Sequence, residues 1–366
     1  MRFGEAIAPE RLADLLRPDE QLDTVLTADV YGAGDADRLL ALALDGVRRE
    51  DVCVIGAVGH DFYEGERQGA KGFPRFTDPA LRRPSEYADY LRMATERSLE
   101  RCAIDSFDVL LLHNPDRTGY TSDAVWNAMA ALRDDGLTAA IGVAPGPANG
   151  FTLDVIGCFE RFGAQIDWAM LILNPLEPWP GELALGAAEA AQVSVIARVV
   201  DYGGLFWDDV HPGHSFRADD HRAFRPAGWV EAGLERIETM RPIAERHGLT
   251  PLQLACAWDL AHPAVNCVAP TLIQENGEDA RPIEDKRAEL ASLPHEPLLD
   301  DEDVAAIRAI GDNSGWMALK GASPDHEGAE LPDRWAIAEA QLALATRWQI
   351  DPDVDLRQHA SHVGSK

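Results

Sequence analysis

The feature that most constrains the fold is the regular alternation of short apolar runs with segments of helical length. The apolar runs recur about eight times and have the length of strands, which is typical of parallel β/α units. Eight units predict a (β/α)8 barrel of the TIM type, whose core needs about 250 residues. An open doubly wound sheet is the alternative. The chain has 366 residues, which leaves room for long βα loops and a C-terminal helical extension.

The expected strands divide the chain into a barrel and a tail. Residues 1–311 are expected to form the barrel, and residues 312–366 a C-terminal extension packed on it, with a helix around Arg334–Trp348. Continuous apolar runs indicate strands that are buried on both faces. The expected strands are Met1–Ile7, Val25–Val30, Val52–Val58, Phe107–His113, Thr138–Val143, Trp168–Leu173, Val193–Val200 and Val265–Ala269.

The composition narrows the kinds of binding partner and the cellular compartment that we expect for this chain. The formal net charge is −29, whereas a nucleic acid or an anionic membrane surface would require a basic face. We therefore expect a small-molecule substrate, no nucleic acid and no membrane, while homo-oligomer formation stays open. The 5 cysteines are scattered without a CxxC pair, as expected for free thiols in a reducing compartment. With no signal peptide or transmembrane-length run in the sequence, the expected location is cytoplasmic.

Polar residues directly follow several of the expected strands. The apolar run Phe107–Leu112 stops at His113 and Asn114. In a barrel, the residues after the carboxyl ends of the strands converge on one mouth, although one histidine alone could equally close a strand with an ordinary hydrogen bond. Several such groups suit a hydroxyl-rich ligand, because each buried donor or acceptor needs a partner. The candidate substrate-binding residues are His60, Asp61, Tyr63, Asn114, Asn174, Asp201 and Tyr202.

Two further patterns carry less weight. His211, His214 and His221 lie among aspartates in one segment, and histidines beside carboxylates can bind a divalent metal. Their spacing crosses a Pro-Gly pair, so they do not share a preformed helical face, and we expect no metal. Gly32-x-Gly34 lacks the third glycine of a dinucleotide fingerprint, and we interpret it as a tight turn.

Several segments resemble the aldo-keto reductase superfamily. In Thr27–Asp37 a strand is followed by Tyr-Gly and an acidic residue that opens a helix, and in Asp105–His113 a strand ends in histidine. The Leu-Leu-His-x-Pro-Asp form is most similar to the branch that oxidises free sugars. The resemblance implies that Tyr31 is the general acid/base and that His113 orients the carbonyl. Further matching segments are Ile141–Val143, Gly204–Phe206 and Asp220–Arg222.

The same resemblance implies an Asp–Lys pair that lowers the pKa of the tyrosine, and this chain departs from it. The Asp position, five residues before Tyr31, is Leu26, and the Lys position, two residues before Gly59, is Ala57. A tyrosine with its ordinary pKa of about 10 can donate a proton but is a poor base at neutral pH. Possible substitutes are Lys71 for the lysine and Asp23 or Asp29 for the acid.

The cofactor implied by the resemblance is NADP or NAD. Arg198 stands where many relatives stack an aromatic ring on the nicotinamide, and Gly204 and Leu205 belong to the loop that follows that strand. The positions that hold the carboxamide in the family are Ala144-Pro145 and Met170, which offer no side-chain hydrogen bond. The late segment Pro270–Gly277 lacks the small-and-basic pattern expected for a 2′-phosphate.

Three hypotheses follow from these residues. The leading one is nicotinamide-dependent oxidation or reduction of a small polyhydroxylated, sugar-like carbonyl compound. The second is a lyase or isomerase reaction without cofactor, in which Tyr31 and His113 work with His60, Asp61 or Asp201 as the base. The third is a catalytically inactive barrel that serves as a binding protein, against which the many polar strand ends argue.

Overall fold

Seven parallel strands form one curled sheet in this computed structural model, which describes residues 3–69, 72–146, 148–277, 279–294 and 296–359. Each strand pairs with the next one along the chain. The strands are β1 (Thr24–Leu26), β2 (Cys53–Val58), β3 (Phe107–His113), β4 (Thr138–Ala144), β5 (Trp168–Ile172), β6 (Ser194–Arg198) and β7 (Val265–Ala269).

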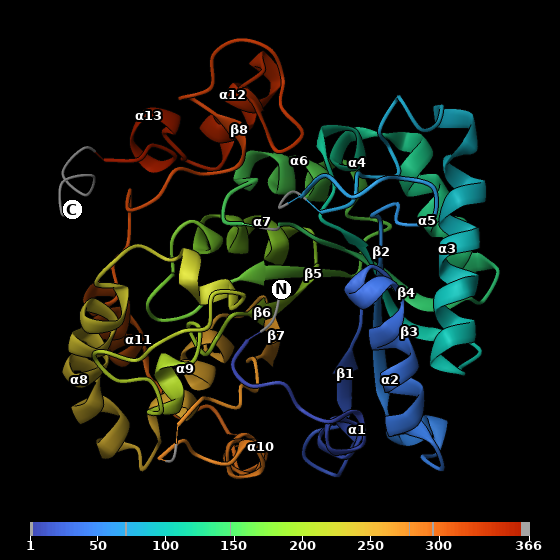
Figure 1. The fold of residues 1–366 in the computed structure, drawn as a ribbon. Helices are drawn as coiled ribbons and strands as arrows, with labels where there is room; N and C mark the ends of the chain where they lie inside the picture. The colour runs from blue at the N-terminus through green and yellow to red at the C-terminus, as the bar shows by residue number, and fades with distance from the viewer. Residues whose placement is uncertain (1–2, 70–71, 147, 278, 295, 360–366) are drawn as a thin grey trace.

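Helices follow the strands along the chain and cover the outside of the sheet (Figure 1). This arrangement confirms the predicted β/α-barrel architecture. The helices are α1 (Pro9–Leu16), α2 (Asp35–Leu44), α3 (Tyr87–Cys102), α4 (Arg117–Thr121), α5 (Asp123–Asp134), α6 (Thr152–Phe162), α7 (Leu185–Ala190), α8 (Trp229–Arg246), α9 (Pro251–Leu260), α10 (Ile283–Ala291), α11 (Asp301–Ile310), α12 (Glu339–Arg347) and α13 (Pro352–Asp355).

The strands are buried on both faces, because successive side chains of a strand point to opposite sides of the sheet. In β3, Leu110 and Leu112 belong to the large apolar cluster between the sheet and the helices. Val109 and Leu111 belong instead to a smaller cluster inside the curl. By the same alternation, His113 at the end of β3 points inward. A continuous apolar run that ends in histidine therefore places the imidazole at the mouth of the barrel.

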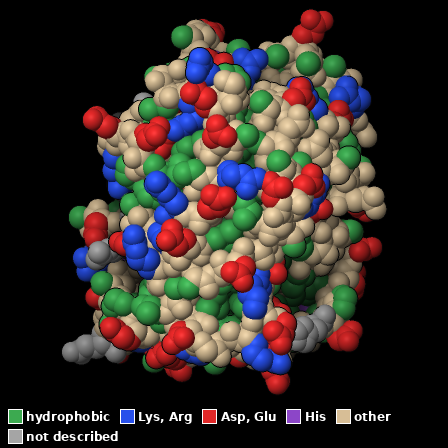
Figure 2. Space-filling view, turned by 90° about the vertical axis from the view of Figure 1, so that its right-hand side faces the viewer, with side chains coloured by type: hydrophobic (Ala, Val, Ile, Leu, Met, Phe, Trp, Pro, Cys, Tyr) green, Lys and Arg blue, Asp and Glu red, His purple; other side chains and the backbone are tan. Residues whose placement is uncertain are grey.

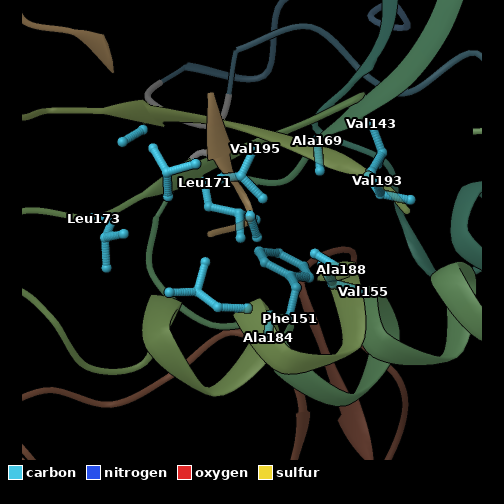
Figure 3. Close-up of a cluster of buried hydrophobic side chains, with 14 of the residues drawn as sticks. Val143, Phe151, Val155, Ala169, Leu171, Leu173, Ala184, Ala188, Val193 and Val195 are labelled. Carbon is cyan, nitrogen blue, oxygen red and sulfur yellow. The ribbon is translucent and has the colours of Figure 1, made fainter. Parts of the chain in front are cut away.

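The outer apolar layer is dense where β4, β5 and β6 face α6 and α7 (Figure 3). Leu171 and Val195 project from the sheet, and Phe151 and Val155 meet them from the helical side. All four side chains are buried, with exposed fractions between 0% and 6%. Burial of such side chains contributes roughly 1.5–3 kcal/mol each, and this layer fixes the strands whose ends carry the site.

The first of the eight expected strands is not formed. Met1 lies outside the described residues, and residues 3–7 contain no strand. They cross the mouth instead, where Glu5 N–H donates to Gln274 O at 2.8 Å and Gly4 N–H donates to Asp220 Oδ2 at 2.8 Å. Within the described residues β1 and β7 are therefore the two edges of the sheet. A short apolar segment without turn signals was too weak a basis for that prediction.

Other elements differ from the prediction mainly at their ends. The strand expected at Val25–Val30 is confined to β1, because the chain turns before Tyr31. The tail helix expected around Arg334–Trp348 starts later, because Arg334–Ala336 forms β9 and pairs with β8 (Gly321–Ser323). The long apolar runs gave strands close to their predicted bounds, since burial on both faces leaves an unambiguous pattern.

The C-terminal segment is anchored to the barrel by buried hydrogen bonds. Asn313 accepts from Trp179 N–H at 3.0 Å and donates to Trp179 O at 2.9 Å. Farther along, the buried carboxylate of Asp154 in α6 accepts from Trp335 Nε1 at 3.0 Å and Gln341 Nε2 at 2.7 Å. Figure 1 shows β8 and α12 lying beside α6. These bonds hold the C-terminal segment against the outside of the barrel.

The surface is acidic overall but mixed in sign. Figure 2 shows Asp and Glu side chains interspersed with Lys and Arg over the face on the right of Figure 1, which carries α3. Ion pairs on such a surface, for example Arg161 with Asp123, contribute little to stability. None of the helices in the described ranges is long and apolar enough to span a membrane.

We expect Asn313→Ala to destabilise the fold by about 2 kcal/mol or more, because the buried N–H and C=O of Trp179 lose their partners. Urea unfolding followed by tryptophan fluorescence measures the change. The control is Asn127→Ala on the exposed side of α5, which should shift the free energy of unfolding by no more than about 0.5 kcal/mol. Equal effects of the two substitutions would contradict the anchoring role of Asn313.

Candidate functional site

A cavity of about 2270 Å³ opens at the carboxyl ends of the strands and extends along the edges of β1 and β7. Its size exceeds what a small substrate requires, because it includes the space between those two edges. The predicted site residues that line it are Tyr31, His60, His113, Asn114, Arg198, Asp201 and Tyr202. The structure therefore brings together residues at or just after the carboxyl ends of four different strands, β1, β2, β3 and β6.

Tyr31 stands in a tight turn after β1. The 3-10 turn Tyr31–Ala33 contains Gly32 at φ 62° and is followed by Gly34 at φ 93°, conformations that favour glycine. The turn directs the phenol over the cavity, and 48% of the side chain is exposed because the cavity is open. Partial loss of hydration at the cavity raises the pKa of the hydroxyl, and the Arg198 guanidinium partly opposes this shift.

His113 lies between Tyr31 and a second histidine, His60. Its ring centroid is 5.6 Å from that of Tyr31 and 5.2 Å from that of His60, with both contacts edge to face. Burial and the nearby His60, Arg198 and Arg75 lower the pKa of His113 well below its usual range. His113 is therefore neutral at pH 7. Its buried Nδ1 has no hydrogen-bond partner among the described residues.

The hydrogen bonds of His60 fix its tautomer. Nδ1 lies 2.9 Å from Phe73 O, which can only accept, so Nδ1 carries the proton. Nε2 then accepts from Asn114 Nδ2 at 3.0 Å. Burial, together with Arg75, lowers the pKa of His60 to about 4. His60 is thus a neutral side chain that holds the Asn114 amide in place.

Arg198 ends β6 and points inward, two residues after the inward-facing Ile196. Its Nη2 donates to Pro145 O at 2.9 Å. A Cβ on Gly146 would lie 2.8 Å from this Nη2 and 2.7 Å from Asn114 Oδ1. The φ of 152° at Gly146 favours glycine, and a side chain there would displace the guanidinium and the amide from each other.

Among the described residues, the lysine that the family implies beside Tyr31 has no replacement at the cavity, and the candidates for the acid differ in position. Ala57 is fully buried in the inner apolar cluster, and Lys71 lies outside the described residues. Asp29 is completely buried without a partner for either carboxylate oxygen, and desolvation together with Asp37 raises its pKa well above the usual range. Of the proposed acids only Asp23 reaches the cavity, where it lines the edge near β1.

Several predicted site residues instead serve the backbone or the core. Asp61 accepts from the backbone N–H groups of Tyr63 and Glu64 and pairs with Arg82. Asn174 accepts from two backbone N–H groups of its own turn. The predicted residues that do not line the cavity are Asp61, Tyr63, Asn174, Gly204 and Leu205. Asp61 and Asn174 thus bond to loop backbone, the Tyr63 hydroxyl accepts from Arg101, and Leu205 is buried in the apolar core.

Asp201 and Tyr202 lie at the cavity but already have partners. Asp201 accepts from Thr271 N–H at 2.8 Å and Gly204 N–H at 2.9 Å, which ties two loops together. Tyr202 packs under the Arg225 guanidinium, whose carbon lies 4.4 Å from the ring centroid. Burial raises the pKa of Tyr202 to about 12. Both side chains therefore form part of the cavity wall and offer few free polar atoms to a ligand.

Some residues near the site were not among the candidates, because no local sequence pattern identifies them. Arg75, from the long loop after β2, donates from Nε to Asn114 O at 2.7 Å. Trp316 and Met317 of the tail line the cavity, whereas Lys320, in the same part of the tail, pairs with Asp333 at 2.7 Å. Long-range placement of loops and tails has no local pattern, so only a structure could identify these residues.

The residues present do not fit the nucleotide contacts that the family implies. Ala144, Pro145 and Met170 offer no side-chain hydrogen bond. In the late segment, the buried Glu275 pairs with Arg222 at 2.5 Å, and Arg222 also pairs with Asp220 at 2.8 Å. The cation that faces this segment is therefore already neutralised.

The histidine-rich segment forms no metal centre among the residues that the structure describes. No group of three or more His, Cys, Asp or Glu side chains is arranged there to hold an ion. His214 lies 3.4 Å from Glu275 Oε2, and the ring centroid of His221 lies 5.7 Å from that of Phe3. These histidines pack the loops over the mouth.

A curled parallel sheet, with a tyrosine and two histidines meeting at the carboxyl ends of its strands, defines a β/α-barrel protein with a ligand site at its mouth. The model of the Aldo/keto reductase family matches residues 22–311. The chain belongs to this family, which confirms the resemblance seen in the sequence.

Known relatives are distant in sequence. A protein of Oryza sativa subsp. japonica described as a probable voltage-gated potassium channel subunit beta is 25% identical over 324 residues, covering 84% of this chain and 89% of the relative. The solved glycerol dehydrogenase AKR11B4 from Gluconobacter oxydans has a TM-score of 0.62 at 22% identity, covering 82% of this chain and 84% of that chain. Aldo-keto reductase AKR11C1 from Bacillus halodurans has a TM-score of 0.58 at 20% identity, covering 83% and 87% respectively. At these identities the solved structures support the fold alone.

We expect the stability of the protein to fall as the pH drops from 7 to 5, and His60 to account for about 2 kcal/mol of that loss. The pKa of His60 is about 4 in the folded state, against 6.5 in the unfolded chain. The unfolded state therefore binds more protons between these values, and acid favours it. Urea unfolding of the His60→Gln variant at both pH values should show a shallower pH dependence.

The control for this measurement is His211→Gln, at an exposed position. This variant should retain the pH dependence of the parent protein, because an exposed imidazole is hydrated in both states. An unchanged slope in His60→Gln would show that His60 is not held neutral by burial.

Proposed function

We propose that the chain is an oxidoreductase that acts on the carbonyl group of a small polyhydroxylated compound. The observation that carries this proposal is the pairing of Tyr31 and His113, 5.6 Å apart between ring centroids, on the wall of one cavity. A phenol and an imidazole placed in this way can both bind one substrate oxygen. Stabilising charge on a carbonyl oxygen is what allows hydride to add to its carbon.

In this proposal Tyr31 is the proton donor. Its pKa is raised by burial above the ordinary value of 10.0, so the hydroxyl keeps its proton at neutral pH. A phenol in that state protonates a developing alkoxide readily but removes a proton from an alcohol poorly. The absence of a lysine at position 57 therefore favours reduction of the carbonyl over oxidation of the alcohol.

His113 orients the substrate oxygen. Its pKa is lowered by burial and by neighbouring cations, so the ring is neutral and presents one N–H donor. The edge-to-face contact with His60 restricts its rotation. A neutral imidazole stabilises a partial negative charge without giving up its proton, which leaves proton transfer to Tyr31.

By resemblance, the hydride partner is a nicotinamide nucleotide. Aldo-keto reductases from Klebsiella pneumoniae, 19% identical with TM-scores of 0.55 and 0.54, are described in complex with NADP and acetate and with NADPH. Such a nucleotide supplies hydride when it is bound. In this chain it would need contacts other than the family's, since the carboxamide and phosphate positions differ.

That misfit favours a second candidate function, namely isomerisation or elimination next to a carbonyl without a nucleotide. Tyr31 would again protonate the oxygen, and a base would remove the neighbouring C–H proton. The predicted bases are poor choices, because Asp61 does not reach the cavity and Asp201 is occupied by two N–H groups. His60, with a pKa of about 4, is a weak base. We therefore rank this function second.

We expect Tyr31→Phe and His113→Ala each to lower kcat/KM for carbonyl reduction by roughly 10²- to 10⁴-fold, because general-acid catalysis and carbonyl orientation are lost. A panel of aldoses and small hydroxycarbonyl compounds, followed through nicotinamide absorbance, is the assay. Tyr63→Phe is the matched control, since this tyrosine bonds to Arg101 away from the cavity and should retain activity. Full activity of Tyr31→Phe would rule out the assigned donor.

Dependence on the nucleotide separates the two candidate functions. We expect substrate turnover by purified protein only with NADPH or NADH added, because no side chain at the mouth can supply hydride. The readout is product formation by chromatography with and without nucleotide. Turnover without nucleotide that is lost in Tyr31→Phe would replace the redox function by the proton-transfer function.

A further inference from the structure

The lining of the cavity is basic although the chain is acidic. The formal net charge is −29, yet arginines outnumber carboxylates along the cavity wall. The lining arginines are Arg67, Arg198, Arg222, Arg225, Arg236 and Arg287, and the lining carboxylates are Asp23, Glu177 and Asp201. A wall of this sign attracts anions to a surface whose overall charge would repel them.

Three of the six arginines that line the cavity are neutralised by carboxylates of the protein itself. Arg222 pairs with two carboxylates, Arg225 lies 3.6 Å from Glu177, and Arg287 lies 2.6 Å from Asp19. Arg67, Arg198 and Arg236 have no carboxylate of the described residues within 4.0 Å, but Arg67 and Arg236 lie over the rings of Phe73 and Trp316. The Arg198 guanidinium can therefore pair with an anion of a bound ligand, and it lies near Tyr31 and His113.

The donors of Arg198 are also incompletely used. A guanidinium has five N–H donors, and Pro145 O is the acceptor found for this one among the described residues. The Nε atom is buried and has no partner. A buried cation without counter-charge destabilises the fold, which a bound anion would relieve.

We propose that Arg198 binds an anionic group, a carboxylate or a phosphate, of the compound whose carbonyl lies between Tyr31 and His113. The proposal rests on the function proposed above and narrows its substrate class to acidic polyhydroxylated carbonyl compounds. Arg198 and Tyr31 are close enough to influence each other's charge, and Asn114 lies between the guanidinium and His60. One small molecule can therefore reach the anion site and the carbonyl site together.

Arg198 is placed at the reacting end of the cavity, and this distinguishes a substrate anion from a nucleotide phosphate. The neighbours of Arg198 are Pro145, Gly146 and Asn114, which follow β3 and β4. The late segment that grips phosphate in the family lies after β7 and faces Arg222. An anion at Arg198 is thus expected to belong to the substrate.

Isothermal titration calorimetry with D-glucuronate and with D-glucuronamide tests the proposal, because the two probes share a shape and differ in the charge of one group. We expect the parent protein to bind glucuronate roughly 10- to 100-fold more tightly than glucuronamide, as a charge-assisted pair provides. In Arg198→Met the two affinities should become equal. Arg198→Lys, which keeps the charge but loses Nε, should retain part of the preference and guards against misfolding of the first variant.

Arg236→Met is the matched control. Arg236 also lines the cavity, but its guanidinium carbon lies 3.9 Å from the Trp316 ring centroid, away from Pro145. The preference for glucuronate should survive this substitution. Its loss in Arg236→Met with retention in Arg198→Met would overturn the assignment, as would equal binding of both probes, or binding of neither, by the parent protein.

Two further measurements show which molecule carries the anion and distinguish a failure of the anion site from a failure of the redox function. Titration with 2′-phospho-ADP-ribose, which lacks nicotinamide, should be insensitive to Arg198→Met, and a loss there equal to that for glucuronate would assign the anion to the nucleotide and overturn the substrate class. Glucuronate binding that depends on Arg198, without any nicotinamide-linked turnover, would retain the anion site and remove the redox function.

Discussion

Side-chain alternation along the parallel strands is the constraint on which the rest of the site depends. In β3, Leu110 and Leu112 pack in the apolar layer beneath the helices. The alternating side chains, Val109, Leu111 and finally His113, must therefore face inward. A shift of one residue would expose the apolar set and turn the imidazole toward the helices. The large free energy of burying the outer layer therefore also determines the direction of one polar side chain.

The fold and the central pair were predictable from the sequence, because their signals are local. A strand buried on both faces appears as an unbroken apolar run, and β3 could be located from Phe107–Leu112 alone. Parallel strands bring their carboxyl ends to one mouth. Once Tyr31 and His113 were recognised as following two such strands, their meeting was a consequence of the architecture.

Which of the other candidates keep free polar atoms at the cavity could not be predicted, because a position after a strand does not determine what a side chain bonds. Asp61, Asn174 and Asp201 all follow strands, yet each carboxylate or amide accepts from backbone N–H groups of the loops. Loops leave such N–H groups without ladder partners, and a nearby short polar side chain satisfies them first. Arg75 and Trp316 come from a long loop and the tail, for which no periodic pattern exists.

Burial at the mouth determines the protonation of every group that could act there. It raises the pKa of Tyr31 and lowers those of His60 and His113, so all three are neutral at pH 7. In the family a lysine counteracts this effect on the tyrosine, and Ala57 cannot. The mouth consequently offers hydrogen-bond donors to a substrate oxygen and no strong base. The electron pair that attacks the carbonyl carbon must then come from a second bound molecule, which is why the chemistry of these residues fits hydride addition better than proton abstraction.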